Sequence, residues 1–366
     1  MHLIPNFTGG GAERQLALLA PELCRLGVEV HVAFGQSGVN SDANLERISN
    51  SDVKHHRIPS RTNYDPMILL RILGVIRSVR PDLVQTWILQ MDVLGGLSAM
   101  LAGVPFVLSE RSSTLMYPRI WKYWLRTQVG RRASSIVANS EGGAAYWKPW
   151  ATQIAVIRNG LSLDLIRNAS PADPAALGFP TGARVILFAG RFSAEKNIDV
   201  LVQALDKVLV ERTDCIALLF GAGELRSSIQ SRVGMARARD RMRLLGYTNE
   251  LWCWMRRASA FVSISKFEGN PNAVLEAMAI GCPLVVSDIP QHREILDDSA
   301  ALLCNPNSVE DVAAAIRKAL SDPAAAAARA EVARRRSADW SVEEAARQYL
   351  QLYNALIINH ETQNAT

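Results

Sequence analysis

The sequence predicts an α/β fold built from two parallel, doubly wound sheets in tandem. Short apolar or β-branched runs alternate with longer helical patterns along the 366 residues, and such alternation is typical of parallel sheets with helical crossovers. A stretch containing Pro, Ala and Gly, residues 169–182, separates two such series. At roughly 100–200 residues per domain, the length also fits two domains.

The expected elements follow the chain in order. Residues 2–5 form a truncated strand, and further strands of the first series are expected at 28–34, 83–86, 105–108, 135–138 and 154–157. The second series is expected at 184–189, 215–220, 242–245, 260–264 and 283–287. Residues 322–336 consist mostly of helix formers and predict an exposed helix. Ser341 and Glu344 have capping-box spacing and predict a final helix of about 17 residues, frayed after Asn359.

These elements divide the chain into three parts. We expect an N-terminal domain over residues 1–165, a C-terminal domain over 166–340, and a closing helix and tail over 341–366 that pack back toward the N-terminal domain. Open α/β sheets bind ligands at the carboxyl ends of their strands. A ligand cleft is therefore expected between the strand ends of the two domains.

Composition excludes several classes of protein. With 49% hydrophobic and 20% charged residues, the chain is unlike a disordered one. Its five cysteines are scattered without a C-x-x-C pair, which favours a reducing compartment. Neither a signal segment nor an apolar run near the ~20 residues of a spanning helix occurs. A cytoplasmic protein is expected.

Charge is distributed unevenly. Residues 1–165 carry 17 basic and 12 acidic side chains, whereas residues 166–366 carry 23 of each. A basic first half indicates an anionic partner, such as a membrane surface or a phosphorylated substrate. A surplus of this size is also common in proteins that bind neither. No nucleic-acid partner is expected.

A glycine-rich turn opens the chain. Residues 8–14 read TGGGAER and lead into a helical pattern, and glycines at a helix N-terminus let backbone N–H groups approach a phosphate. The pattern is neither G-x-G-x-x-G nor a P-loop, because no Gly-Lys-Ser/Thr follows. The alternative is a plain glycine turn.

The second half places charged and small residues after successive strands. Arg191 and Lys196 lie on one strand-to-helix loop, where two cations could grip a diphosphate; the alternative is a solvated loop with an Arg–Glu pair. Gly221 follows the next strand, and Tyr247 follows the third. Together these strand ends predict a crevice for a nucleotide base and ribose.

Residues 267–279 (FEGNPNAVLEAMA) are the most informative segment. Asn270 can cap a helix whose first turn contains Pro271, so the N–H groups of residues 272–274 are expected to be free to bind a phosphate or sugar oxygen. Glu268 in the loop and Glu276 in the helix could accept hydrogen bonds from sugar or ribose hydroxyls. The alternative is that acidic residues near a helix start only favour its dipole.

These motifs together resemble the retaining glycosyltransferases of family 4, which have the GT-B fold of two Rossmann-like domains. The resemblance rests on Gly10 to Arg14, Gly190 to Asn197, Gly221 to Gly223, the two glutamates with seven residues between them, and GCPLVVS at 281–287. It therefore covers nearly the whole chain. The resemblance implies a metal-independent hexosyltransferase (EC 2.4), and no D-x-D motif occurs in this sequence.

The resemblance also implies roles for individual residues. Arg191 and Lys196 would hold the donor diphosphate, Glu268 would face the donor sugar, and Glu276 would bind the ribose hydroxyls. The remaining implied donor contacts are Gly10, Gly11, Gly221, Tyr247, Asn270, Asn272, Ala273 and Val274. Positive charge would stabilise the departing diphosphate while the acceptor hydroxyl attacks from the same face. The nucleotide sugar is a substrate, and no cofactor is expected.

One departure from the family concerns the acceptor side. Many members carry a histidine after the fourth strand of the first domain, where this chain has Glu110 and Arg111. Arg111 takes the histidine's position in this comparison. Arginine stays protonated and cannot act as a base at neutral pH, but it can bind a phosphate or orient an acceptor.

The segment 117–132 (YPRIWKYWLRTQVGRR) combines aromatic and cationic residues. This composition suits an interfacial helix on anionic lipid. The alternative is that Trp121, Trp124 and Leu125 form a buried helix face and that the basic residues, Arg126 among them, are solvated.

The leading hypothesis is a retaining transferase that moves a sugar from a nucleotide-sugar donor, a UDP-sugar in the first instance, to a glycan or polyprenyl-diphosphate-linked acceptor during polysaccharide biosynthesis. An epimerase or hydrolase on the same fold is the first alternative. The second is a nucleotide-sugar-binding protein that has lost catalysis.

Overall fold

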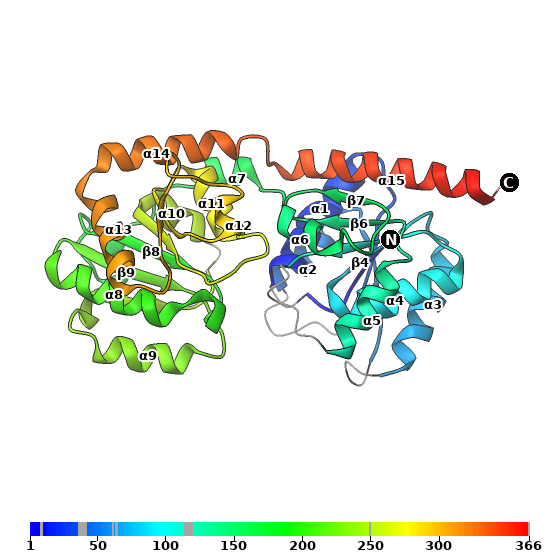
Figure 1. Ribbon diagram of the computed structural model, residues 1–366, viewed down its shortest axis with the longest axis horizontal. Coiled ribbons are helices and arrows are strands. Elements are labelled where there is room, and N and C mark those ends of the chain that lie inside the picture. The colour runs from blue at the N-terminus through cyan, green and yellow to red at the C-terminus, as the bar shows by residue number, and fades with distance from the viewer. Residues whose placement is uncertain are drawn as a thin grey trace. The chain divides into compact units, whose positions relative to one another are not determined.

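The computed structural model describes residues 1–7, 10–35, 42–60, 62, 65–112, 120–248 and 250–364. The chain divides into two compact units, one made of Met1–Gly160 with Trp340–Thr366 and the other of Leu161–Asp339. Each unit contains a parallel sheet covered by helices (Figure 1). The predicted α/β fold with two Rossmann-like parallel sheets is confirmed.

The first unit has a sheet in the order β3-β2-β1-β4-β5-β6-β7, with all neighbouring strands parallel. Its strands are β1 (His2–Ile4), β2 (His31–Phe34), β3 (Lys54–Arg57), β4 (Val84–Trp87), β5 (Phe106–Glu110), β6 (Ser135–Ala138) and β7 (Ile154–Val156). Its described helices are α1 (Gly11–Arg25), α2 (Asp42–Ser49), α3 (Met67–Val79), α4 (Ile88–Ala102), α5 (Trp121–Gly130), α6 (Glu141–Trp147) and α15 (Val342–Asn364). Because strand side chains alternate between faces, Ile4 packs in the core with α1 and α15, and Leu3 packs in the core with α3 and α4.

The second unit has a sheet in the order β10-β9-β8-β11-β12-β13, again parallel throughout. Its strands are β8 (Arg184–Ala189), β9 (Cys215–Phe220), β10 (Met242–Leu245), β11 (Ala258–Ser263), β12 (Leu284–Ser287) and β13 (Leu302–Cys304). Its described helices are α7 (Leu163–Arg167), α8 (Ile198–Glu211), α9 (Arg226–Met235), α10 (Leu251–Arg257), α11 (Asn272–Ile280), α12 (Pro290–Arg293), α13 (Val309–Ser321) and α14 (Pro323–Arg336). Helices α8 and α13 share one core with the sheet.

Two strands have no counterpart among the predicted ones. Strand β3 reads KHHR and is largely exposed at the edge of its sheet. Strand β13 has three residues and lies at an edge of the other sheet. Edge strands bury fewer side chains than central ones, so the apolar pattern that predicts a strand is weak or short in them.

The closing helix belongs to the first unit. Ser341 Oγ accepts the N–H of Glu344 at 3.1 Å, as the capping-box spacing predicts, but α15 continues to Asn364 and is longer than expected. It packs against α1 and buries Tyr349, Tyr353 and Leu356 in the first core. The second unit begins at Leu161, and the chain returns to the first unit at Trp340. The sequence predicts these two boundaries at residues 166 and 341.

A charged cluster lies inside the first unit. Arg126 is 3% exposed, and its guanidinium donates to Asp92 Oδ2 and to Glu110 Oε2, both at 2.7 Å. Trp147 Nε1 donates to the same Glu110 oxygen at 2.8 Å. Both carboxylates are fully buried, so each must be paired to remain charged there. The expectation that Arg126 is a solvated or membrane-facing cation is therefore wrong.

This cluster is expected to make the stability of the first unit depend on pH. Burial raises the pKa of Asp92 to about 6, against the opposing attraction of Arg126. The unfolded chain has a lower pKa at this residue, so the stabilisation by the protonated form is present below about pH 4 and is lost as the pH rises through about 6.

The substitution Asp92→Asn should remove this dependence. The free energy of unfolding of the variant minus that of the unsubstituted protein should rise by on the order of 3 kcal/mol from about pH 4 to pH 7. Urea unfolding followed by tryptophan fluorescence across this range measures the difference. A difference between the two proteins that stays constant with pH would contradict the assignment.

Candidate functional site

The carboxyl end of the second sheet brings Lys196 and Glu268 together across 72 residues of sequence. Lys196 ends a 3₁₀ turn (Ala194–Lys196) that follows β8, and Glu268 lies in the loop between β11 and α11. Lys196 Nζ donates to Glu268 Oε1 at 2.6 Å, and Ser265 Oγ donates to the same oxygen at 2.6 Å. Arg191, Lys196 and Glu268 are the side chains predicted to act on the donor diphosphate and sugar, and two of these three are thus in direct contact.

Glu268 is a buried but ionised carboxylate, in a residue that is 8% exposed. Burial raises the pKa of this carboxyl, but the charge of Lys196 and the hydrogen bonds from Lys196 and Ser265 outweigh that effect. The pKa of Glu268 therefore lies below its ordinary value. At neutral pH the group is a hydrogen-bond acceptor only.

The two oxygens of Glu268 differ in their surroundings. Oε1 accepts both hydrogen bonds, from Lys196 and from Ser265. Oε2 accepts none from any residue in the part of the chain that the structure describes. This arrangement leaves one oxygen of a fixed carboxylate available to a hydroxyl group.

Helix α11 begins one residue later than predicted. Its N-cap is Pro271, so the expectation that Asn270 caps the helix is wrong. The N–H of Asn272 donates to Asn270 O at 3.0 Å, and the N–H of Val274 donates to Pro271 O at 2.9 Å. Two of the three amides expected to be free are used within this turn. Only Ala273 among the three has no backbone carbonyl partner in the described residues.

The other predicted donor residues lie near the strand ends with different exposure. Glu276 is in α11 and is 4% exposed. The Arg191 side chain is exposed and makes neither an ion pair nor a hydrogen bond with any described residue. Tyr247 follows β10 and is 73% exposed. The ligand contacts expected of these residues stay predictions.

Gly221 allows two loops to pack closely. Its φ is +151°, and a Cβ there would lie 1.9 Å from Gly190 O. Gly223, with φ +156°, would place a Cβ 2.4 Å from Phe192 O. Backbone hydrogen bonds join the same loops, including Phe192 N–H to Ala222 O at 2.8 Å. These glycines are therefore required by the fold itself, whatever ligand approaches them.

The glycine turn of the first unit leads into α1 as expected. Gly10 is the N-cap, and a Cβ on it would lie 2.3 Å from Glu13 Oε2, so the glycine makes room for this carboxylate. Thr8 and Gly9 lie outside the described residues. The expected contact of Gly10 and Gly11 with a donor diphosphate stays a prediction.

On the acceptor side, Glu110 has a structural position. It is fully buried, and its carboxylate binds Arg126, Trp147 and the backbone N–H of Ser112. These contacts give Glu110 a structural role, and its predicted place on the acceptor side stays a prediction.

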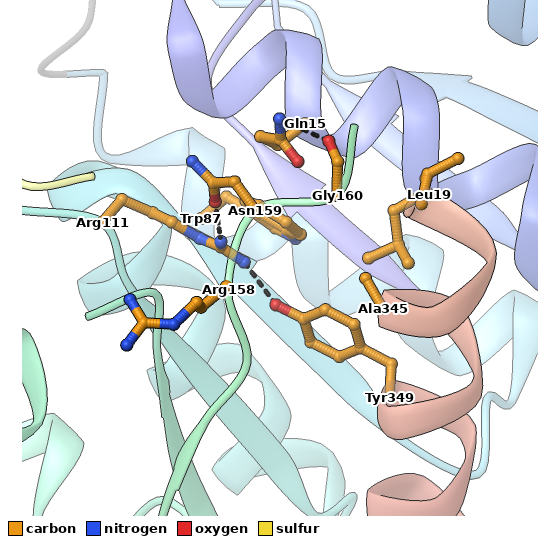
Figure 2. A pocket seen from close by; sticks show the side chains of 10 residues that line it. Gln15, Leu19, Trp87, Arg111, Arg158, Asn159, Gly160, Ala345 and Tyr349 are labelled. Atoms are coloured by element: carbon orange, nitrogen blue, oxygen red, sulfur yellow. Dashed lines mark hydrogen bonds between the residues drawn. The ribbon is translucent and has the colours of Figure 1, made fainter. Parts of the chain in front are cut away.

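Arg111 lines a small pocket of the first unit (Figure 2). Its guanidinium lies 4.1 Å from the ring centre of Trp87 and donates to Asn159 Oδ1 at 3.0 Å and to the hydroxyl of Tyr349 at 2.5 Å. Figure 2 shows Arg111 and Tyr349 pointing toward each other. Arg111 therefore links α15 to the end of β5, and an acceptor contact for it stays a prediction.

Sequence reasoning missed the polar residues that support Glu268. Ser265 lies two residues after β11. Its position between a buried strand and Glu268 is the sequence feature from which it could have been identified. Ser287 ends β12 and donates to Ser265 O at 2.6 Å. His292, in α12, contacts Ser287. No spacing in the sequence connects these segments, because β11 and β12 meet only through sheet pairing.

Two further properties concern only the described residues. No group of three or more His, Cys, Asp or Glu side chains in them is arranged to hold a metal ion. None of their helices is both long enough and apolar enough to cross a membrane.

Both halves of the chain match known families. Residues 9–165 match the family described as Glycosyltransferase Family 4, and residues 170–336 match the one described as Glycosyl transferases group 1. Two parallel-sheet units with these matches define a glycosyltransferase of the GT-B fold. The chain belongs to the family 4 type of these enzymes, so the predictions of a family 4 glycosyltransferase and of the GT-B fold are confirmed.

Individual proteins show the same relationship. Glycogen synthase of Mycobacterium tuberculosis is 27% identical over 304 residues, covering 78% of this chain and 72% of that protein. The UDP-Gal:alpha-D-GlcNAc-diphosphoundecaprenol alpha-1,3-galactosyltransferase of Escherichia coli is 25% identical over 243 residues, 62% of each chain. A crystal structure of Anabaena Alr3699/HepE in complex with UDP and glucose has a TM-score of 0.85 at 19% identity, covering 97% and 98% of the two chains.

The close packing at Gly221 generates a stability prediction. Gly221→Ala should destabilise the second unit by about 1–3 kcal/mol through its backbone conformation alone, with the clash against Gly190 O added. Gly246→Ala is the matched control, because a Cβ at Gly246 meets nothing within 4 Å. Thermal and urea unfolding compare the two variants. Equal stability of the two would contradict the packing requirement.

Proposed function

We propose that the protein is a retaining, metal-independent transferase that moves a sugar from a UDP-sugar to a glycan or polyprenyl-diphosphate-linked acceptor in polysaccharide assembly. The observation that carries the donor site is the partly buried Lys196–Glu268 pair at the strand ends of the second sheet, with Glu268 Oε2 left open. A cation beside an ionised carboxylate suits a ligand that bears both a diphosphate and sugar hydroxyls.

Donor binding assigns a different task to each group. Glu268 Oε2 accepts a hydroxyl of the donor sugar, while Lys196 and the exposed Arg191 attract the diphosphate. Glu276 binds the ribose hydroxyls, and Tyr247, which is exposed after β10, lies against the base. Among the backbone groups of Asn270, Asn272, Ala273 and Val274, the N–H of Ala273 is the one proposed to donate to the donor, since it has no backbone carbonyl partner among the described residues.

The reaction exchanges one bond at the anomeric carbon for another. The bond from that carbon to the diphosphate oxygen breaks, and the new bond forms to the acceptor oxygen on the same face. The departing diphosphate takes up the negative charge and accepts the proton of the acceptor hydroxyl. Lys196 and Arg191 stabilise this charge as it develops. The enzyme needs no other reactant for this balance.

Two relatives support this choice of substrates. The Escherichia coli relative is named for a UDP-galactose donor and a diphosphoundecaprenol-linked acceptor. The Anabaena structure is described with UDP and glucose bound. Both names fit a UDP-sugar donor, and the first also fits a lipid-linked acceptor.

A surface on α5 supports peripheral contact with an anionic membrane, and therefore a lipid-linked acceptor. Trp121 and Trp124 are 67% and 64% exposed on successive turns, so the alternative that they are core residues is wrong. Arg131 and Arg132 directly after the helix are exposed as well. Exposed tryptophan beside cations fits the interface of an anionic bilayer. Residues 117–119 of this segment lie outside the described residues.

The donor proposal is tested with a ligand panel. UDP, GDP and ADP, and UDP-galactose, UDP-glucose, GDP-mannose and ADP-glucose, are added separately, because a ligand that binds only the native state raises the melting temperature. We expect the UDP ligands to produce the largest shift and Lys196→Ala to abolish it. Lys207→Ala is the control, because Lys207 pairs with Glu310 on the surface of the same unit. If no ligand of the panel raises the melting temperature of the protein, the donor proposal is overturned.

The membrane proposal is tested by sedimentation with vesicles. The unsubstituted protein should sediment with phosphatidylglycerol vesicles and less with phosphatidylcholine vesicles, and the double substitution Trp121→Ala and Trp124→Ala should lower binding roughly tenfold or more by removing two interfacial anchors. Met235→Ala, which removes another exposed apolar side chain (78% exposed), is the control. Equal binding of the tryptophan variant and the control would argue against this surface.

A further inference from the structure

A fully buried histidine lies behind the loop that carries Glu268. His292 is in α12, which follows β12, and none of its surface is exposed. The neighbouring strands β11 and β12 are paired in parallel, so the segment after β12 lies beside the segment after β11. None of the family motifs in the sequence includes this residue.

Hydrogen bonds connect His292 to Glu268 through Ser287 and Ser265. His292 Nδ1 lies 2.9 Å from Ser287 O and 3.1 Å from Ser287 Oγ. A carbonyl oxygen only accepts, so Nδ1 carries the proton. The hydroxyl of Ser287 donates to Ser265 O at 2.6 Å, and the hydroxyl of Ser265 donates to Glu268 Oε1 at 2.6 Å. Each serine hydroxyl therefore donates to one acceptor, and the Nδ1 proton lies close to both oxygens of Ser287.

The imidazole is neutral in this position. Burial lowers the pKa of His292, and this effect outweighs the opposing attraction of Glu268 and the hydrogen bond to Ser287. His292 Nε2 has no hydrogen-bond partner among the described residues. Only the Nδ1 side of the ring is therefore used, and its function is to hold Ser287.

We propose that His292 is a positioning residue for the donor sugar, acting through Ser287 and Ser265 to keep Glu268 Oε1 fixed and Glu268 Oε2 directed to a sugar hydroxyl. This inference rests on the proposed donor site. His292 does not touch the donor. Its loss loosens the serine pair, so the carboxylate samples orientations in which Oε2 no longer meets the hydroxyl, while the diphosphate contacts of Lys196 are kept.

Two conservative substitutions separate the two ring nitrogens. The side-chain amide of asparagine is attached at the same carbon as Nδ1, so His292→Asn keeps a donor to Ser287 O. The amide of glutamine is one carbon further out, at the position of Nε2, so His292→Gln removes that donor. Both variants have similar polarity and similar size, which controls for the general effect of replacing a buried ring.

The experiment measures calorimetric affinities of the full chain for UDP and for UDP-galactose and UDP-glucose. His292→Gln should bind the sugar nucleotides about tenfold more weakly, the size expected for the loss of one well-placed hydrogen bond, with unchanged affinity for UDP. His292→Asn should stay within about threefold of the unsubstituted protein for all three ligands. The double variant with both Glu268→Gln and His292→Gln should bind the sugar nucleotides as weakly as the Glu268→Gln variant alone. Both substitutions act through the same carboxylate.

The outcomes separate this inference from the proposed function. If the unsubstituted protein binds none of the three ligands, the proposal of a UDP-sugar donor is overturned. The positioning role of His292 is then overturned as well. If it binds them and His292→Gln loses affinity for UDP as much as for the sugar nucleotides, only the positioning role is overturned. Equal loss in His292→Asn and His292→Gln also overturns it, since a merely structural histidine would not distinguish the two nitrogens. Melting temperatures within a few degrees of each other confirm that both variants are folded.

Discussion

The site of the second unit depends on keeping a carboxylate charged inside the protein. Burial disfavours the ionised form of Glu268, and the structure offsets this with a cation and a hydroxyl on the same oxygen. Because Lys196 and Ser265 come from loops after different strands, the sheet must hold β8 and β11 side by side before the carboxylate can be ionised. The charge of the site is therefore a product of the fold.

A second constraint is the close packing of the loops around that carboxylate. The Gly221 and Gly223 backbones contact the loop after β8, from which Lys196 also comes. The sequence pattern of small residues after strands predicts a crevice for a nucleotide base and ribose, and the structure shows that the same glycines first make room for the neighbouring backbone. One residue type satisfies both requirements, so a glycine motif alone does not distinguish a binding loop from a packed one.

Local patterns predict what local physics determines. The central strands, α14, the Ser341 cap and the charged loop residues were all visible in short stretches of sequence, because apolar periodicity, helix propensity and capping act over a few residues. The edge strand at Lys54–Arg57 lacks that periodicity. Tertiary contacts determine the features that the sequence does not predict. Arg126 is buried against two carboxylates from other elements, and the N-cap of α11 is Pro271 rather than Asn270.

The return of the chain to its first unit affects the order in which the protein can be built. Helix α15 completes a core whose other buried members all lie at or before Ile157, and its Tyr349 accepts a hydrogen bond from Arg111 across 238 residues. During translation, the second unit is complete when Asp339 has emerged, whereas the first still lacks a helix. Domains generally fold as units, so the unit that begins first is the last to be completed. The face of α1 that packs against α15 stays uncovered until α15 has been synthesised.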